Sequence, residues 1–288
     1  KLLMTLIAVQ MAGGVYVPLD PLYPCDRIQY MFEEANLKYL VLERDNSKAE
    51  QIDVTKKIYI DDLEELSRNI PMTVDEIVCK VEGNDLAYLL FTSGSTGKPK
   101  GIMISHGALS NFLISMSEFP GCSQDDTLLA VTTICFDIAG LEMYLMLIVG
   151  GKVEILSDKL TRDGIQLLSK MQNTSFTIMQ ATPATWQMLL AAGWEERLPI
   201  KILCGGEALS RELADKLLSL SDEVYNMYGP TETTIWSTIS KVEENTTITI
   251  GKPIRKTSVY VLDEDMKEVK NGEIGELYIG GAGVAQGY

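Results

Sequence analysis

Residues 91–101 read Phe91-Thr92-Ser93-Gly94-Ser95-Thr96-Gly97-Lys98-Pro99-Lys100-Gly101 and follow an apolar run that begins at Leu86. Glycines let the backbone come close to a ligand, free N–H groups and hydroxyls donate hydrogen bonds, and lysines supply positive charge. This combination suits a polyphosphate. We therefore predict a phosphate-binding loop whose ligand-contacting residues are Thr92, Ser93, Gly94, Ser95, Thr96, Gly97, Lys98 and Lys100.

The order of residues in this loop excludes a Walker A motif. In that motif a Lys is followed by Ser or Thr at the start of a helix. Here Pro99 follows Lys98, and residues 101–105 have the apolar character of a second strand. We expect a mobile loop between two strands. Taken alone, the segment is equally compatible with a flexible hairpin tip that binds nothing.

The bulk composition limits the classes of function. The chain has 288 residues, 46% of them hydrophobic and 23% charged, as in an ordinary soluble globular protein. Its formal net charge of −15 disfavours a nucleic-acid or anionic-membrane surface, because no broad basic face can be assembled. An anionic ligand must then be attracted by a local cluster, for which Lys98 and Lys100 are the candidates.

Cysteine and histidine usage disfavours a zinc site and a disulfide framework. The five cysteines are scattered without a C-x-x-C pair, and His106 is the single histidine. Scattered thiols favour a cytoplasmic location. We expect His106, directly after Ser105, to have a capping or packing role at a helix start.

Short apolar runs alternate with helical patterns, which predicts a largely parallel α/β architecture. The predicted strands are 15–19, 39–42, 57–60, 86–92, 128–132, 152–155, 176–181, 201–204 and 223–228. The predicted helices are 27–35, 107–118, 141–149, 164–170, 183–192 and 210–218, besides a buried N-terminal helix that ends near Gly13. After Trp236 the runs 239–250, 258–262 and 276–280 predict an antiparallel subdomain, so we divide the chain into 1–236 and 237–288.

Five motifs in order give the chain a family resemblance. They are the lysine-bearing loop together with residues 14–28 (including Gly14, Pro18, Asp20 and Arg27), 136–143 (Phe136, Asp137, Glu142), 226–233 (Asn-Met-Tyr-Gly-Pro-Thr-Glu-Thr) and 275–288. Together they resemble the adenylation (AMP-binding) domain of nonribosomal peptide synthetases, within the adenylate-forming superfamily. The resemblance covers essentially the whole chain. It implies a large core of stacked, mostly parallel sheets with flanking helices, running into an antiparallel β-barrel-like subdomain.

The resemblance also implies roles for the ATP-binding residues. Catalysis would depend on Lys98, Thr231 and Glu232, with Glu232 holding Mg²⁺, a hard cation that prefers oxygen ligands. Thr231 would donate its hydroxyl to the α-phosphate, Tyr228 would stack on adenine, and Asn226 would pair with the amino edge of the base. The further nucleotide-binding residues implied are Gly205, Gly206, Glu207, Met227 and Gly229.

The amino-acid site is implied by Asp137, which in the resembled family binds the α-ammonium group of the substrate. A buried aspartate after an apolar strand is costly without a cationic partner. The family's other pocket positions fall on Phe136, Ile138, Leu141, Gln180, Leu203, Gly205, Met227, Ile235 and Trp236. Most are bulky, so we expect glycine as substrate, with alanine second because one methyl group gives only about 1–3 kcal/mol of discrimination.

The implied reaction forms an aminoacyl-adenylate and pyrophosphate from ATP, for loading onto phosphopantetheine. The partners would be a peptidyl carrier domain and a neighbouring condensation domain. We expect the chain to be cut at both ends and to lack the mobile C-terminal subdomain, so residues 1–288 alone should be poorly active. An acyl- or aryl-CoA ligase relative and a non-catalytic scaffold of the same fold are the alternatives.

Overall fold

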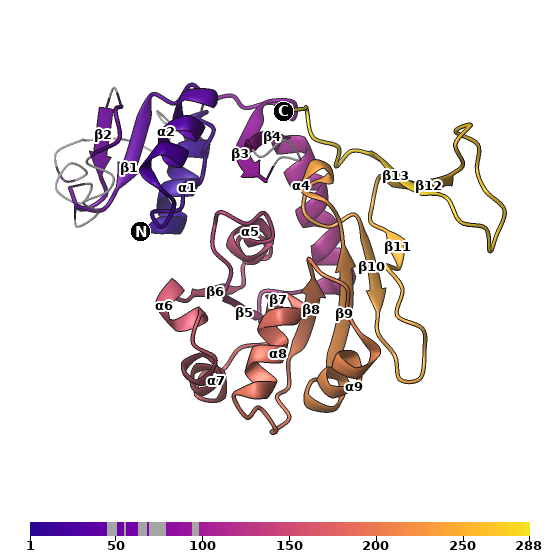
Figure 1. Cartoon of the computed structure of the whole chain (residues 1–288). Helices are drawn as coiled ribbons and strands as arrows, with labels where there is room; N and C mark the ends of the chain where they lie inside the picture. Colours follow the sequence, from indigo (N-terminus) through magenta and orange to yellow (C-terminus); the bar gives the residue numbers. More distant parts are fainter. Residues whose placement is uncertain (45–50, 55, 63–67, 69–78, 94–97) are drawn as a thin grey trace. The chain divides into compact units, whose positions relative to one another are not determined.

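The computed structural model describes residues 1–44, 51–54, 56–62, 68, 79–93 and 98–288. Its backbone contacts divide the chain into two compact units (Figure 1). Unit 1 contains Lys1–His106 and Gln286–Tyr288, and unit 2 contains Gly107–Ala285.

The described residues of unit 1 form two helices and two pairs of strands. The elements are α1 (Leu2–Met11), α2 (Cys25–Glu34), β1 (Tyr39–Leu42), β2 (Lys56–Tyr59), β3 (Leu86–Thr92) and β4 (Lys100–Ser105). β1 and β2 are parallel, whereas β3 and β4 are antiparallel and pair Thr92 with Lys100. The two strands predicted around the lysine loop are therefore confirmed. The strand predicted at 15–19 is wrong, since only Tyr16 forms a bridge, to Tyr88, and Pro18 has no N–H to extend the ladder.

The large sheet of unit 2 has the order β11-β10-β9-β8-β7-β5-β6. Its strands are β5 (Thr127–Ala130), β6 (Lys152–Ile155), β7 (Ile178–Ala181), β8 (Lys201–Gly205), β9 (Glu223–Tyr228), β10 (Thr238–Lys241) and β11 (Lys252–Pro253). β6, β5, β7, β8 and β9 are parallel, and β10 and β11 are added antiparallel at one edge. The predicted α/β class with a mostly parallel sheet is confirmed.

Helices connect these strands, and several begin at side-chain caps. They are α4 (His106–Met116), the π-helical turn η3 (Ser117–Gly121), α5 (Ala139–Val149), α6 (Asp158–Thr161), α7 (Gly164–Gln172), α8 (Pro183–Ala191), α9 (Arg211–Leu220) and the 3₁₀ turn η4 (Thr231–Thr233). Asp163, Thr182 and Ser210 accept hydrogen bonds from N–H groups in the first turns of α7, α8 and α9. Such caps satisfy donors that a helix start leaves free, and each contributes about 1 kcal/mol.

The two faces of the large sheet have different roles. Ile202 and Cys204 of β8 belong to a buried apolar cluster with side chains of α7, α8 and α9. Successive strand residues point to opposite faces, so Leu203 and Gly205 point to the other side. Gln180 of β7 pairs in register with Leu203 and shares that side. The face opposite α7, α8 and α9 therefore carries the predicted pocket residues.

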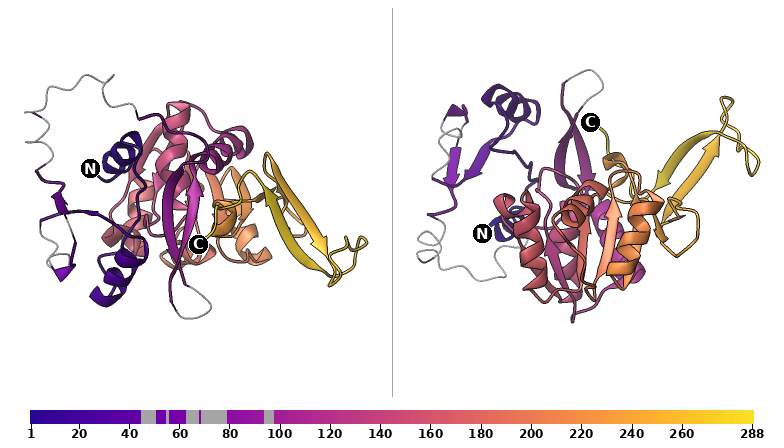
Figure 2. Two further views of the ribbon diagram at one scale, coloured as in Figure 1. Left: turned by 90° about the horizontal axis from the view of Figure 1, so that it is seen from above. Right: turned by 60° about the horizontal axis from the view of Figure 1, so that its bottom comes forward.

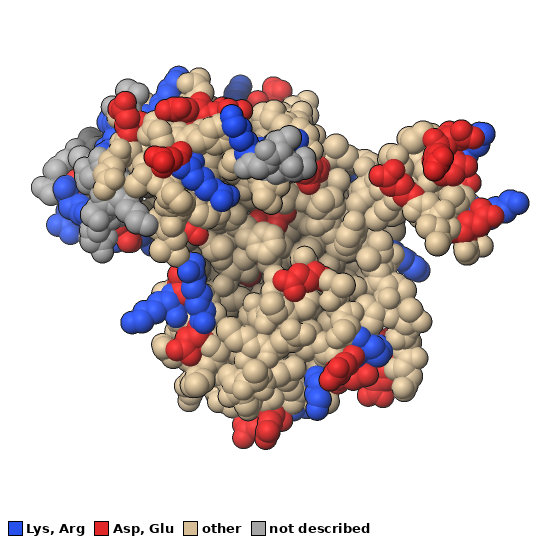
Figure 3. Space-filling view, viewed as in Figure 1, with Lys and Arg blue, Asp and Glu red and all other residues tan. Residues whose placement is uncertain are grey.

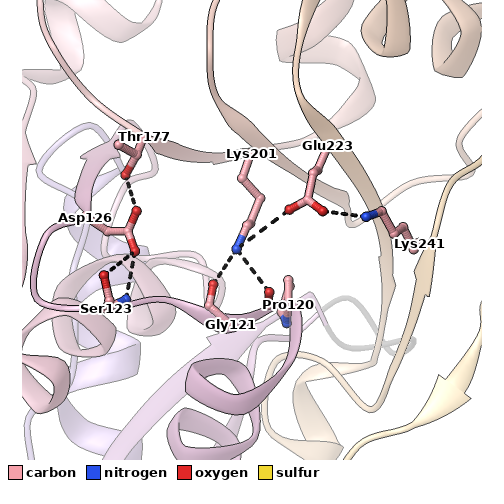
Figure 4. Close-up of polar contacts among 8 residues, drawn as sticks. All are labelled: Pro120, Gly121, Ser123, Asp126, Thr177, Lys201, Glu223 and Lys241. Carbon is pink, nitrogen blue, oxygen red and sulfur yellow. Dashed lines mark hydrogen bonds and ion pairs between the residues drawn. The ribbon is translucent and has the colours of Figure 1, made fainter.

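Hydrogen bonds and ion pairs connect the π-helical turn η3 to the amino-terminal ends of the parallel strands (Figure 4). Lys201, at the start of β8, donates from Nζ to the carbonyl oxygen of Pro120 at 3.0 Å and to that of Gly121. Glu223, at the start of β9, pairs with Lys241 at the end of β10. This network lies at the strand ends opposite to those that carry the predicted site.

The antiparallel region expected after Trp236 is distributed over two sheets. The predicted strand 239–250 ends at Lys241, because the chain turns at Asn245 (φ +57°), and Gly251 has φ +83° before β11 begins. β10 and β11 join the large sheet, while β12 (Thr257–Leu262) and β13 (Glu276–Gly281) form a separate antiparallel pair. No closed barrel is formed by the described strands.

The hairpin of β12 and β13 extends away from the large sheet in both views of Figure 2. Its tip carries acidic and basic side chains (Figure 3), among them the ion pair of Lys267 with Asp265. Among the described residues, no helix has the length and apolar character needed to cross a membrane.

Candidate active site

The predicted site residues of unit 2 follow the carboxyl ends of its parallel strands. Asp137 comes after β5, Gln180 lies next to the last residue of β7, Gly206 comes after β8, and Tyr228 ends β9. Because these strands are parallel, their carboxyl ends meet at one edge of the sheet, which is where open α/β sheets bind ligands. The sheet therefore brings these four positions together.

Asp137 is a buried carboxylate that has no cationic partner within the described part of the chain. It is 5% exposed, and its Oδ2 accepts a hydrogen bond from the Thr231 hydroxyl at 2.7 Å. Burial raises the pKa of Asp137 to about 6, the nearby Glu232 charge acts in the same direction, and the Thr231 hydrogen bond opposes both. Among the described residues, no Lys or Arg forms an ion pair with it. A cationic ligand would remove this cost.

The wall beside Asp137 is closed by bulky side chains. The pocket residues predicted from the sequence that are at most 2% exposed are Ile138, Leu141, Gln180, Leu203, Met227, Ile235 and Trp236. A Cβ on Gly205 would lie 2.6 Å from Cη2 of Trp236 and 2.6 Å from the carbonyl oxygen of Met227. The position of the Trp236 ring therefore requires glycine at 205.

Two residues in the left-handed region bring Ile235 and Trp236 into this wall. Thr234 has φ +63° and Ile235 has φ +68°, which is unusual for β-branched side chains. The surrounding contacts hold this backbone in place, since the Thr234 hydroxyl donates to the carbonyl of Gly283 at 2.7 Å and the Ala285 N–H donates to that of Glu232 at 2.8 Å. Strain of this kind clusters at ligand sites.

A buried polar chain runs beneath the pocket. Nε1 of Trp236 donates to Oε1 of Gln180 at 2.8 Å, and Nε2 of Gln180 donates to the carbonyl oxygen of Ile138 at 2.8 Å. Nε2 also lies 3.3 Å from Oε1 of Glu142, which is fully buried. Burial raises the pKa of Glu142 to about 7, while its hydrogen bonds act against that shift.

Glu142 was not predicted as a site residue, although the sequence contains a signal for it. It is the only charged residue of α5, whose other residues are apolar or glycine. A lone carboxylate in such a helix requires buried donors. Nothing local in the sequence shows that one donor comes from Gln180, on a different element.

The residues predicted to contact adenine have different environments. Tyr228 is 38% exposed and presents a flat ring at this edge, and Phe136, predicted for the amino-acid pocket, is equally exposed. Gly206 has φ +87°, so the backbone after β8 suits glycine. Asn226 is 7% exposed, and its side-chain N–H₂ group donates to the carbonyl oxygen of Thr249 at 2.8 Å. Its pairing with a base stays a prediction.

Thr231 and Glu232 lie together on η4. The described residues contain no group of three or more His, Cys, Asp or Glu side chains that could hold a metal ion. The Glu232 carboxylate offers the oxygen ligands that Mg²⁺ prefers, and this ion usually binds through one or two carboxylates together with substrate phosphates. The residue therefore fits the ion that the sequence predicts.

The lysine loop belongs to unit 1, and Gly94, Ser95, Thr96 and Gly97 lie outside the described residues. Lys98 and Lys100 are exposed. Nζ of Lys98 lies 5.8 Å from the Tyr30 ring centroid, and Nζ of Lys100 lies 5.1 Å from that of Tyr288. Contact of this loop with the same nucleotide as Glu232 stays a prediction.

His106 is the first residue of α4, and its backbone N–H donates to the carbonyl oxygen of Asp85 at 2.9 Å. Partial burial lowers the pKa of its side chain, while the Asp85 charge acts against that shift. This position agrees with a packing role at the helix start.

The family model described as AMP-binding enzyme matches residues 1–288. The chain belongs to the AMP-binding enzyme family. The predicted resemblance to adenylation domains is thereby confirmed, and the relatives that follow are synthetases of this kind.

The adenylation domain is 43% identical over 291 residues to the PKS-NRPS hybrid synthetase acdB of Aspergillus candidus, covering 100% of this chain and 12% of that protein. It is 40% identical over 294 residues to the dimodular nonribosomal peptide synthase of Bacillus subtilis, covering 100% of this chain and 12% of that protein. The chain thus spans about an eighth of the length of these curated relatives.

Solved structures support the same fold. A holo four-domain nonribosomal peptide synthetase bound to AMP and glycine matches with a TM-score of 0.88 and 37% identity, covering 100% of this chain and 21% of that one. The N-terminal subdomain of Klebsiella oxytoca NpsA, in complex with 3-hydroxyanthranilyl-AMSN, matches with a TM-score of 0.84 at 23% identity, covering 100% of this chain and 72% of that one. The second likeness supports the fold alone.

Proposed function

We propose that this adenylation domain activates a small amino acid with ATP, forming an aminoacyl-adenylate and pyrophosphate. The single observation that supports the proposal most is Asp137, a carboxylate 5% exposed with no cationic partner among the described residues. An α-ammonium group is the cation that such a site would bind. A fatty or aryl acid carries no such group.

In the proposed reaction the substrate carboxylate is the nucleophile and needs no general base, because it is ionised at neutral pH. Its oxygen forms a bond to the α-phosphorus of ATP, the bond from that phosphorus to the bridging oxygen breaks, and pyrophosphate leaves. The protein positions the reactants and stabilises developing negative charge. Lys98 and the loop N–H groups would contact phosphates, and Thr231 would move its hydroxyl from Asp137 to the α-phosphate.

Magnesium would neutralise phosphate charge when bound. Glu232 is the residue proposed to hold it, since it lies on the same turn as Thr231. Tyr228, with its exposed ring, would stack on adenine, and Gly205, Gly206 and Glu207 would border the base.

Glycine is the proposed substrate, and alanine the second choice. The support is steric: the wall residues beside Asp137 are at most 2% exposed, so little volume remains beyond the substrate Cα. A related synthetase was solved with glycine and AMP bound. The activated amino acid would then pass to phosphopantetheine on a carrier domain, with a condensation domain as a further partner in the synthetase.

ATP–pyrophosphate exchange by the full-length protein tests this function with a panel of amino acids and one aryl acid. We expect exchange with glycine, weaker exchange with alanine and none with the aryl acid. Asp137→Ala should raise the KM for the amino acid at least about 100-fold, because breaking a buried charge pair costs about 3–5 kcal/mol, and it should change the KM for ATP little. Unchanged amino-acid activation in Asp137→Ala would instead favour a CoA-ligase-type acid site.

A further inference from the structure

Glu142 makes four hydrogen bonds inside unit 2, and every partner is a donor. Its Oε2 accepts from the N–H groups of Val131 at 3.1 Å and Thr132 at 3.0 Å. Its Oε1 accepts from the Thr132 hydroxyl at 2.7 Å and from Nε2 of Gln180 at 3.3 Å. The carboxylate thus joins the end of β5 to the middle of β7.

These contacts fix the orientation of the Gln180 amide. Its nitrogen faces two oxygens, one of Glu142 and one of Ile138, while its oxygen faces the indole N–H of Trp236. A flipped amide would place an oxygen against two oxygens and an N–H₂ group against an N–H group. All three contacts would be lost, and buried polar groups would be left unpaired.

The Gln180 amide in turn fixes two parts of the pocket. It holds the carbonyl of Ile138, the residue that follows Asp137, and it holds the indole of Trp236, whose ring approaches Gly205 so closely that no Cβ fits there. We propose that Glu142 is a positioning residue that sets the selectivity of the amino-acid pocket by holding the Gln180 amide in one orientation. This inference rests on the proposed function.

The substitution Glu142→Gln isolates the effect because it preserves size and removes one acceptor. The oxygen of the new amide at position 142 can accept from the N–H groups of Val131 and Thr132. The N–H₂ group of that amide then faces the N–H₂ group of Gln180. The Gln180 amide must then flip or withdraw, and the Trp236 indole loses its fixed acceptor. The Trp236 ring beside Gly205 is then held less firmly, so the pocket can admit a larger side chain.

The test measures kcat/KM in ATP–pyrophosphate exchange by the full-length protein, for the preferred amino acid and the next larger one. We expect Glu142→Gln to reduce the ratio of the two values about tenfold, the size of effect that one methyl group gives in a tight pocket. In a Gln180→Leu background the same substitution should leave the ratio unchanged, because the link to the pocket is already broken.

Asp126→Asn is the matched control for a merely structural role. Asp126 is also a hydrogen-bonded carboxylate, accepting from the Thr177 hydroxyl and the Ser123 N–H, both at 2.7 Å, but it lies at the amino-terminal ends of the strands (Figure 4). Its substitution should lower the melting temperature without changing the selectivity ratio. Thr132→Val, which removes one donor to Glu142, is the milder variant if Glu142→Gln does not fold, and should reduce the ratio about threefold.

The outcomes separate the inference from the proposed function. If the wild-type protein activates no amino acid, the proposed function fails. If it discriminates between amino acids and the variants at Glu142 and Thr132 keep the wild-type ratio, the positioning role of Glu142 is overturned while the proposed function stands. A ratio that falls equally in Asp126→Asn also overturns it.

Discussion

At the scale of single residues, the site combines two buried carboxylates with different surroundings. Glu142 is surrounded by protein donors, whereas Asp137 has the Thr231 hydroxyl as its side-chain partner. A carboxylate with several fixed donors is satisfied in the free protein. Asp137 is therefore the group that has most to gain from a cationic ligand.

Asp137 should destabilise the ligand-free protein at alkaline pH. Burial raises its pKa from the ordinary 3.8 to about 6, so between these values the folded state binds more protons than the unfolded state. Its contribution to the free energy of unfolding is then largest below about pH 4 and is lost as the pH rises through 6. We predict that Asp137→Asn raises the melting temperature relative to wild type at pH 8, and raises it much less at pH 4.5.

Differential scanning calorimetry of the two proteins at both pH values measures this difference. At pH 8 a saturating amino-acid ligand should make the wild-type protein melt at the higher temperature, because the ammonium group of the ligand pairs with the ionised Asp137 carboxylate. An equal difference at both pH values would show that Asp137 is not a buried ionisable group.

Glu232→Gln should reduce magnesium-dependent adenylate formation by about 100-fold, because a neutral amide is a poor Mg²⁺ ligand. The measurement is ATP–pyrophosphate exchange by the full-length protein as a function of Mg²⁺ concentration. Glu264→Gln, which removes one exposed negative charge from the hairpin of unit 2, is the control and should have no effect. Equal exchange in the two variants would show that Glu232 does not hold the magnesium ion, whereas no exchange by the wild-type protein would favour the non-catalytic scaffold.

At the scale of elements, the close contact between the end of β8 and Trp236 leads to a prediction on stability. Gly205→Ala places a Cβ 2.6 Å from both Cη2 of Trp236 and the carbonyl oxygen of Met227. Either the indole ring of Trp236 or the end of β8 must therefore shift. We predict a loss of about 1–3 kcal/mol, typical of overpacking, together with reduced activity. Gly280→Ala is the control, since a Cβ there meets nothing within 4 Å. Thermal unfolding of both variants tests the prediction, and equal melting temperatures would contradict it.

Element prediction succeeded where the pattern is local. The alternation in β7 and β8 places Gln180, Leu203 and Gly205 on one face, and the cap-forming residues start α7, α8 and α9. The prediction failed where a single residue interrupts an apolar pattern that favours a strand, as Pro18 does in the segment 15–19. Backbone turns with positive φ ended the run that begins at Ile239 in the same way.

The long-range polar contacts could not be predicted from the sequence. The bond between Gln180 and Glu142 joins residues 38 apart in the sequence, and that between Asn226 and Thr249 joins residues 23 apart. Their existence depends on the order of strands in the sheet and on the fold of the loop after β10. The motif resemblance predicted roles for Asp137 and Glu232, but it gave no indication that Thr231 bonds to Asp137.

At the scale of the whole molecule, the proposed function would have residues of both units contact one nucleotide. Lys98 and Lys100 belong to unit 1, while Asp137, Thr231 and Glu232 belong to unit 2. We propose that these lysines and a magnesium ion offset the charge of a triphosphate in a protein whose own net charge is −15. We also propose that the amino acid and ATP bind at the carboxyl edge of the large sheet.

A crystal structure of the full-length protein with Mg²⁺, a non-hydrolysable ATP analogue and glycine tests this claim most directly. We expect Lys98 at about 3 Å from a phosphate oxygen, Glu232 as a ligand of the magnesium ion at about 2.1 Å, and the glycine ammonium against Asp137. A triphosphate bound to the lysine loop with its magnesium ion remote from Glu232, or a glycine ammonium paired with a residue other than Asp137, would contradict it.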